Sequence, residues 1–186
     1  MSKRNILLVI SGPSGVGKGT IANILKKKLD LALSISCTTR NPRPGEVDGR
    51  EYFFISKEEF ESKIKNGGFL EYSSHFDNYY GTPKDFVLNE LKTKDVILEI
   101  DVNGGLLVKQ NYKDAVLIMI APPSKEELKN RLLKRNTESL EKIEFRLERV
   151  DYELAKASEY DYVVVNDDLQ TAVKKTEEII NKEKSL

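Results

Sequence analysis

Four short runs of apolar residues stand out in an otherwise polar chain. They cover residues 6–10, 96–100, 115–120 and 162–165. The runs are largely continuous and do not alternate with polar residues, which is typical of strands buried on both faces of a parallel sheet. The pattern therefore predicts four central strands of one parallel sheet.

The segments between these runs have the periodicity of helices. Apolar positions recur three and four residues apart, so that they share one helix face. They are Ile21, Ile24, Leu25 and Leu29 after the first run, Leu128 and Leu132 after the third, a long series over residues 140–157, and Leu169, Ala172, Val173 and Ile179 near the C-terminus. Because strands that alternate with helices form βαβ units, we expect a three-layer α/β core.

The region from about residue 33 to residue 76 has a different pattern. Residues 51–55 and 69–72 are predicted as short strands around a helix near residues 57–64. Residues 41–49 contain two prolines and two glycines, which favour a loop. We expect a small β-rich insertion beside the main sheet, where it can hold a second ligand. Residues 181–186 are predicted to fray.

Composition and charge narrow the functional classes. The chain has 186 residues, which suits one domain, and 30 Lys and Arg balance 30 Asp and Glu. Zero net charge argues against a general nucleic-acid binder. The single cysteine excludes an internal disulfide. No apolar run reaches the roughly 18 residues of a membrane helix, and the first run is too short for a signal peptide. We therefore expect a cytoplasmic protein without nucleic-acid or membrane partners.

A glycine-rich segment follows the first predicted strand and opens the first predicted helix. It reads Gly12-Pro13-Ser14-Gly15-Val16-Gly17-Lys18-Gly19-Thr20. Glycines let backbone N–H groups turn toward a phosphate, the helix N-terminus adds a favourable dipole, and the lysine supplies a full charge. In this context the segment predicts a phosphate-binding loop for ATP.

One position departs from the usual form of that loop. Ser or Thr normally follows the lysine and reaches Mg²⁺, whereas this chain has Gly19 there and Thr20 one residue later. Thr20 can contact the metal or a phosphate, and the sequence leaves both open. Glu99 and Asp101 follow a predicted strand, where α/β sheets bind ligands. Either carboxylate can hold metal-bound water, contact a substrate or lie in a solvated loop.

Candidates for a second site lie in the predicted insertion. Arg40 and Arg43 flank a stiff proline turn, and Tyr52 follows it. Arginine forks suit phosphate oxygens, although two loop arginines are as often simply solvated. Glu71 follows an apolar pair and can lie at the edge of a pocket or on an exposed strand. The one cysteine, Cys37, is expected to be a small packed residue, because it has no evident activating partner.

Together these motifs resemble guanylate kinase over nearly the whole chain. They occur in the order of that family: the phosphate loop, residues 36–52 with Thr38-Thr39-Arg40 and Arg43-Pro44-Gly45-Glu46, Phe69-Leu70-Glu71, Tyr79-Tyr80-Gly81-Thr82, Glu99-Ile100-Asp101, and residues 120–124 and 165–169. The resemblance implies transfer of the γ-phosphate of ATP to GMP, and also to dGMP. It implies one domain, with a P-loop kinase core of residues 1–33, 84–123 and 153–186, a GMP-binding region of residues 34–83 and a helical lid of residues 124–152.

The resemblance also implies roles for individual residues. The GMP phosphate is expected at Arg40, Arg43, Tyr52 and Tyr80, the guanine at Ser36, Glu71 and Thr82, and the base or the metal waters at Asp101. Physical chemistry agrees for the glutamate. A carboxylate accepts both guanine N1–H and N2–H₂, whereas adenine N1 is itself an acceptor, and buried polar sites reject ligands that leave them unpaired.

The lid is expected to supply the arginines that neutralise charge during phosphoryl transfer. The family pattern puts Arg131 and Arg135 on the lid and Arg146 on the following helix. Periodicity alone does not predict the direction in which the Arg146 side chain points. The implied catalytic set is Lys18, Arg43, Arg135 and Arg146. Asn136 stands where the family usually has glycine, and asparagine tolerates left-handed backbone well. Mg²⁺ is expected to be held mainly by phosphates and water, with Thr20 as a possible ligand.

Two alternative functions remain at this point. Adenylate kinases carry the same Lys18-Gly19-Thr20 variant, but Glu71 and the Arg-Pro-Gly-Glu loop speak against one. Guanylate-kinase-like interaction modules share the fold without catalysis, but this chain keeps Lys18, Asp101, Arg135 and Arg146. The expected partners are ATP and GMP, with the protein acting as a monomer or a homodimer.

Overall fold

The computed structural model describes residues 4–75, 77–134 and 140–186. The main sheet contains β1 (Leu7–Ser11), β2 (Ala32–Leu33), β7 (Val96–Glu99), β8 (Val116–Ala121) and β9 (Tyr162–Val165). Their order is β2-β7-β1-β8-β9, and every neighbouring pair is parallel. The four predicted strands are confirmed, and β2 adds a short edge strand that the apolar pattern did not predict.

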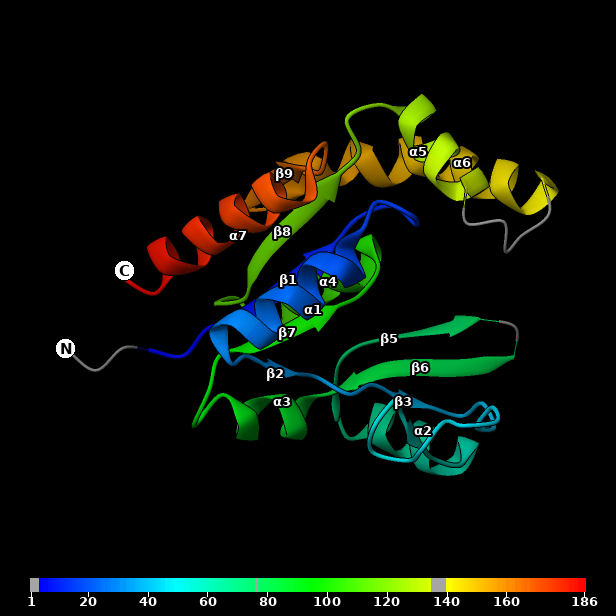
Figure 1. The fold of residues 1–186 in the computed structure, drawn as a ribbon. Coiled ribbons are helices and arrows are strands. Elements are labelled where there is room, and N and C mark those ends of the chain that lie inside the picture. Colours follow the sequence, from blue (N-terminus) through cyan, green and yellow to red (C-terminus); the bar gives the residue numbers. More distant parts are fainter. Residues whose placement is uncertain (1–3, 76, 135–139) are drawn as a thin grey trace.

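Helices cover both faces of this sheet, because alternate residues of its strands point to opposite sides. Leu8 and Ile10 of β1 pack with α1 (Lys18–Leu29) and α7 (Leu169–Glu183). Leu7 and Val9 pack instead with α3 (Lys84–Glu90) and α4 (Val102–Asn111). The three-layer α/β core predicted from the sequence is confirmed, and Figure 1 shows α1 and α4 on either side of the sheet.

The β-rich insertion forms a second sheet. It contains β3 (Cys37–Thr38), β4 (Phe53–Phe54), β5 (Phe69–His75) and β6 (Asn78–Pro83), in the order β4-β3-β6-β5. The helix α2 (Lys57–Lys65) begins with a capping box between Ser56 and Glu59 and packs on this sheet. Its Phe60 is fully buried and stacks on Phe69, with ring centroids 4.3 Å apart. This separate small core makes the insertion a distinct layer next to the main sheet (Figure 1).

The insertion is joined to the main core through β5 and α4. Leu70 is fully buried in the apolar cluster of α3 and α4, and its carbonyl accepts a hydrogen bond from Asn111 Nδ2 (2.8 Å). Glu71 follows directly in the chain. The strand therefore brings this residue to the boundary between the two sheets.

Three helical segments lie near β8 and β9, away from the insertion. They are α5 (Lys125–Lys134), α6 (Leu140–Ala155) and the 3₁₀ helix η1 (Lys156–Glu159). The predicted long helix over residues 140–157 is thus α-helical to Ala155 and continues as a 3₁₀ helix from Lys156. Figure 1 shows α5 and α6 side by side at the end of the fold where the phosphate loop lies.

The prediction that residues 181–186 fray is wrong for most of that segment. The last helix runs to Glu183, and Lys184 then forms an ion pair with Asp95. Asp95 is buried and also accepts the Ile6 N–H (2.9 Å). The buried carboxylate therefore holds the C-terminal turn. None of the helices in the described part of the chain has the length and apolar character that a membrane crossing requires.

Candidate active site

The phosphate loop lies between β1 and α1, packed against two other strand ends. Gly12 has φ 150°, and a Cβ there would lie 2.2 Å from the carbonyl oxygen of Ile120. Gly17 precedes α1 with φ 96° and offers no side-chain cap, and the first turn of the helix has no acidic residue. The amides of that turn are therefore available to an anion, as a phosphate site requires.

Asn166 is a residue of this loop environment that the sequence reasoning did not assign. It follows β9, is buried, and donates a hydrogen bond from Nδ2 to the carbonyl of Val16 (2.8 Å). A Cβ on Gly17 would lie 2.6 Å from the same Nδ2. Its position directly after a parallel strand is the signal that could have found it, because the same rule selected Glu99 and Asp101.

The unusual Gly19 lies next to Glu99. These residues are close because β1 and β7 are neighbours and Ile10 is paired with Glu99. A Cβ on Gly19 would lie 3.2 Å from both carboxylate oxygens of Glu99. Thr20 is exposed in the first turn of α1. A hydroxyl and a carboxylate are hard oxygen donors that suit Mg²⁺, so these residues fit a metal that is held mainly by nucleotide phosphates.

No metal cage is built from side chains alone in the part of the chain that the structure describes. There, no group of three or more His, Cys, Asp or Glu is arranged to hold an ion.

The predicted base readers meet where the two sheets adjoin. Glu71 on β5 and Thr82 on β6 are register partners, and Thr82 Oγ1 donates to Glu71 Oε1 (2.6 Å). Glu71 is only 7% exposed. Burial raises the pKa of its carboxyl above the ordinary value, the Thr82 hydrogen bond acts in the opposite direction, and the charge of Asp101 raises the pKa further.

Asp101 reaches the same place from the main sheet. It caps α4, where its Oδ1 accepts the Gly104 N–H (2.8 Å). A Cβ on Gly104 would lie 3.2 Å from Glu71 Oε2 and 3.5 Å from Asp101 Oδ1. The two carboxylates therefore flank one bare glycine. Ser36 precedes β3, and the antiparallel pairing of Cys37 with Gly81 brings its backbone next to Thr82.

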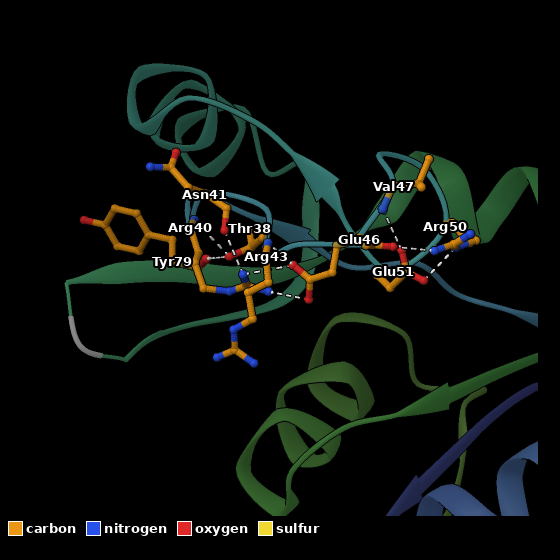
Figure 2. A network of polar contacts seen from close by, with 10 residues as sticks. Thr38, Arg40, Asn41, Arg43, Glu46, Val47, Arg50, Glu51 and Tyr79 are labelled. Carbon is orange, nitrogen blue, oxygen red and sulfur yellow. Dashed lines mark hydrogen bonds and ion pairs between the residues drawn. The ribbon is translucent and has the colours of Figure 1, made fainter.

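A second cluster surrounds Arg40 (Figure 2). Its guanidinium forms a bidentate ion pair with Glu46, with Nη1 3.0 Å from Oε2 and Nη2 2.9 Å from Oε1. The guanidinium carbon also lies 5.5 Å from the ring centroid of Tyr52. The Tyr52 and Tyr80 ring centroids are 6.0 Å apart. The Glu46 hydrogen bond is the main cause that raises the Arg40 pKa, and a hydrogen bond with Tyr80 acts in the same direction.

Arg43 belongs to this cluster through its backbone. Its N–H donates to Glu46 Oε2 (2.7 Å), whereas its side chain is exposed. Figure 2 shows the Arg43 guanidinium extending away from Glu46. Three of the four residues predicted to hold a phosphate thus lie together, and Arg43 adjoins them with its guanidinium exposed to solvent.

The helix α6 contacts the phosphate loop directly. Arg146 on α6 donates to the hydroxyl of Ser14 within that loop. Arg131 on α5 donates to the carbonyl of Asn166 (2.9 Å) and to Glu127 Oε1 (2.9 Å). The implied catalytic Arg135, together with Asn136, lies outside the described residues.

Glu153 is a further residue that the sequence reasoning missed. Its side chain is 13% exposed and pairs with Arg149 (3.7 Å). Burial raises the pKa of Glu153, and the charges of Arg149 and Lys18 lower it. The carboxylate is therefore close enough to the lysine of the phosphate loop for the two charges to interact. Its spacing of seven residues from Arg146 on one helix face is the signal that could have found it.

Two cavities help to locate the chemistry. One of about 330 Å³ adjoins the phosphate loop and is lined in part by Thr20, Arg131 and Asn166. A larger one of about 910 Å³ lies at the opposite, amino-terminal edge of the main sheet, lined in part by Tyr112 and Tyr162. Three of the cations lining the larger cavity are already ion-paired: Arg4 with Asp114, Lys109 with Asp161, and Lys184 with Asp95. Of these two cavities, the smaller one adjoins the phosphate loop and the larger one does not.

Cys37 lies in the small core of the second sheet. It is buried, and burial raises its pKa to about 11. The thiol is therefore protonated at neutral pH, and the expectation of a small packed residue is confirmed.

Comparison with known proteins agrees with this geometry. The family model described as guanylate kinase matches residues 4–183. The chain is 52% identical to the guanylate kinase of Clostridium tetani, covering 98% of this chain and 88% of that protein. It is 53% identical to the guanylate kinase of Caldanaerobacter subterraneus, covering 99% and 90%. The crystal structure of guanylate kinase from Anaplasma phagocytophilum superposes with a TM-score of 0.75 at 32% identity, covering 98% of this chain and 87% of that one. The chain belongs to the guanylate kinase family, whose members are P-loop kinases that transfer a phosphoryl group from ATP to GMP.

Proposed function

We propose that this protein transfers the γ-phosphoryl group of ATP to GMP through the residues described above. The observation that carries the proposal is the buried Glu71–Thr82 pair at the junction of the two sheets. It is an acceptor site for guanine on the small sheet, and it lies beside Asp101, whose carbonyl accepts the hydroxyl of Ser11 directly before the phosphate loop.

The base is read by Glu71. One of its oxygens accepts the Thr82 hydroxyl, and the carboxylate retains acceptor capacity for guanine N1–H and N2–H₂. Asp101 lies beside it on the other side of Gly104. AMP would put the unprotonated N1 of adenine against carboxylate lone pairs, and this supports selection of guanine. The proposed contacts involve the base and the phosphate, so we extend the proposal to dGMP.

The GMP phosphate binds at Arg40, Tyr52 and Tyr80, and Arg43 turns in from the loop. Guanidinium groups and phenol hydroxyls donate to phosphate oxygens, and arginine forks do so with two parallel bonds. The clustering of the first three residues supports this assignment.

The ATP phosphates bind at the amides of residues 12–20 and at Lys18, with the nucleoside part in the adjoining cavity of about 330 Å³. Arg146, which contacts Ser14, neutralises charge on the transferring group, and the resemblance adds Arg135. When bound with ATP, Mg²⁺ supplies further charge neutralisation, and Thr20 and Glu99 are the residues that would hold it directly or through water. Closure of α5 and α6 excludes water, which would otherwise hydrolyse ATP.

The substrates also suggest the cellular location and the partners of the protein. ATP and GMP are cytoplasmic metabolites, which supports a cytoplasmic location. We propose no nucleic-acid or membrane partner, and a monomer or homodimer as the working form.

A coupled ADP-release assay with Mg-ATP tests the proposal, with GMP, dGMP, AMP, CMP and UMP compared as acceptors. We expect turnover with GMP and dGMP alone. Turnover with AMP in their place would show that the base site is wrongly assigned. The absence of turnover with every acceptor would favour a non-catalytic interaction module.

A further inference from the structure

We propose that Glu46 is a positioning residue for the acceptor phosphate: it clamps one edge of the Arg40 guanidinium so that the adjacent edge faces the phosphate of GMP. It also fixes the backbone of Arg43 in the same loop. This inference rests on the proposed function, because it requires that the GMP phosphate binds at Arg40.

The clamp is a bidentate ion pair in a sheltered place. Both guanidinium Nη atoms lie within 3.0 Å of the Glu46 carboxylate. The Arg40 side chain is 15% exposed and that of Glu46 18%. The same carboxylate accepts the N–H of Arg43. One side chain thus joins both ends of a turn that contains Pro42 and Pro44, as Figure 2 shows for the residues that it labels.

The donors of Arg40 are divided between two edges. A guanidinium has five N–H groups in a fixed plane. One on Nη1 and one on Nη2 bind Glu46, and a further Nη1–H binds the carbonyl of Asn41 (2.7 Å). The remaining N–H groups, on Nε and Nη2, are parallel on the adjacent edge, and the hydrogen bond of this guanidinium with Tyr80 places that second proposed phosphate ligand beside Arg40. A phosphate accepts such a pair side by side.

The surroundings leave the guanidinium little freedom to turn. Its carbon lies 5.5 Å and 5.8 Å from the ring centroids of Tyr52 and Phe54. A hydrogen bond with Tyr80 also involves this guanidinium. Because Arg40 lowers the pKa of Glu46, the clamp stays ionised at neutral pH. The arginine is therefore ordered before GMP arrives, and its ordering no longer opposes binding.

Glu51 provides a matched control in the same loop. Its carboxylate likewise accepts an arginine, Arg50 Nε (2.6 Å), and a backbone amide, Val47 N–H (2.7 Å). Its partners are thus equivalent in kind, but they are not the proposed phosphate ligands. Figure 2 shows the two carboxylates with their separate partners.

The test compares Glu46→Gln with Glu51→Gln by steady-state kinetics and by calorimetric titration of GMP without ATP. Glutamine keeps the shape but presents one oxygen and an NH₂ donor to Arg40. For Glu46→Gln we expect KM and Kd for GMP to rise about tenfold, with KM for ATP within about twofold, since ordering one long side chain has that order of effect. Glu51→Gln should leave all these constants within about twofold. Equal GMP affinity in the two variants would overturn the proposal.

A double-mutant cycle with Arg40→Met shows whether Glu46 acts through Arg40. We expect Arg40→Met to weaken GMP binding strongly, and Glu46→Gln to cause no further loss in that background. A further tenfold loss there would show that Glu46 acts by another route and would contradict the proposal. If Arg40→Met leaves Kd for GMP unchanged, then the phosphate assignment of the proposed function is itself wrong.

Thermal unfolding and a second substitution separate positioning from folding. Glu46→Asp keeps the charge but withdraws the carboxylate by one methylene, so we expect an intermediate Kd for GMP. If the midpoints of Glu46→Gln and Glu51→Gln fall equally and both substrates bind more weakly, then Glu46 only stabilises the loop.

Discussion

The side chain of Asn166 donates a hydrogen bond to the backbone carbonyl of Val16, 150 positions earlier in the chain. The end of β9 thereby holds the phosphate loop in shape, and the carbonyl of Asn166 also accepts Arg131 from the lid helix α5. The phosphate loop, the end of β9 and the helix α5 thus all contact Asn166.

Asn166→Ala should loosen the phosphate loop. It leaves the buried Val16 carbonyl without a partner, which costs about 1–3 kcal/mol of unfolding free energy. We expect KM for ATP to rise more than KM for GMP, because the loop binds the donor. Denaturant titration and kinetics with each substrate varied check this, with the exposed Asn130→Ala as control. Equal changes in both KM values would count against the assignment.

Glu71→Gln should reduce the preference for GMP over AMP. The glutamine amide presents an NH₂ donor where guanine also donates, so one acceptor for GMP is lost. The same NH₂ can donate to N1 of adenine, so AMP gains a hydrogen bond. We expect the ratio of kcat/KM values for the two acceptors to fall by at least about tenfold. Competition between GMP and AMP measures this, and an unchanged ratio would remove Glu71 from the role of base reader.

The same substitution should change how stability depends on pH. Burial raises the pKa of Glu71 in the folded state from the ordinary 4.5. The folded protein then binds this proton more tightly than the unfolded chain, so stability falls as pH rises from about that ordinary value through the raised folded value. The unfolding free energy of Glu71→Gln relative to the unsubstituted protein should therefore increase over this window. Urea titrations at a series of pH values test it, and a flat difference would show that the pKa is not raised.

Gly105→Ala should destabilise the fold through two collisions, one with Ser11 Oγ at 2.9 Å and a more severe one with Tyr160. A Cβ there would lie 2.3 Å from the hydroxyl of Tyr160, which donates to the carbonyl of Val102 (2.9 Å). We expect a loss of about 1–3 kcal/mol, as for other overpacked sites.

Removing that hydroxyl provides the check. In Tyr160→Phe the more severe collision is absent while the one with Ser11 Oγ remains, so Gly105→Ala should cost clearly less in that background. Thermal or urea unfolding of the two single variants and the double variant gives the coupling. Strict additivity would mean that the collision is relieved in some other way.

Local patterns predicted much of the fold. The four apolar runs became β1, β7, β8 and β9, and the glycine-rich segment became the phosphate loop. These features depend on residues near one another in the chain. The strand β2 has only Ala32 and Leu33, too short a stretch for any periodicity to reveal. The C-terminal residues look like a polar, fraying end, but Lys184 finds a buried partner in Asp95, 89 positions earlier.

By itself, the sequence determined the three-layer core, the phosphate loop, the β-rich insertion and, through the order of its motifs, the family. Tertiary structure alone decided which side chains meet: Glu71 with Asp101 across Gly104, and Arg146 with Ser14. The physical reason is that periodicity sets which face of an element is buried. Which polar groups then come together depends on strand register and on packing between elements far apart in the chain.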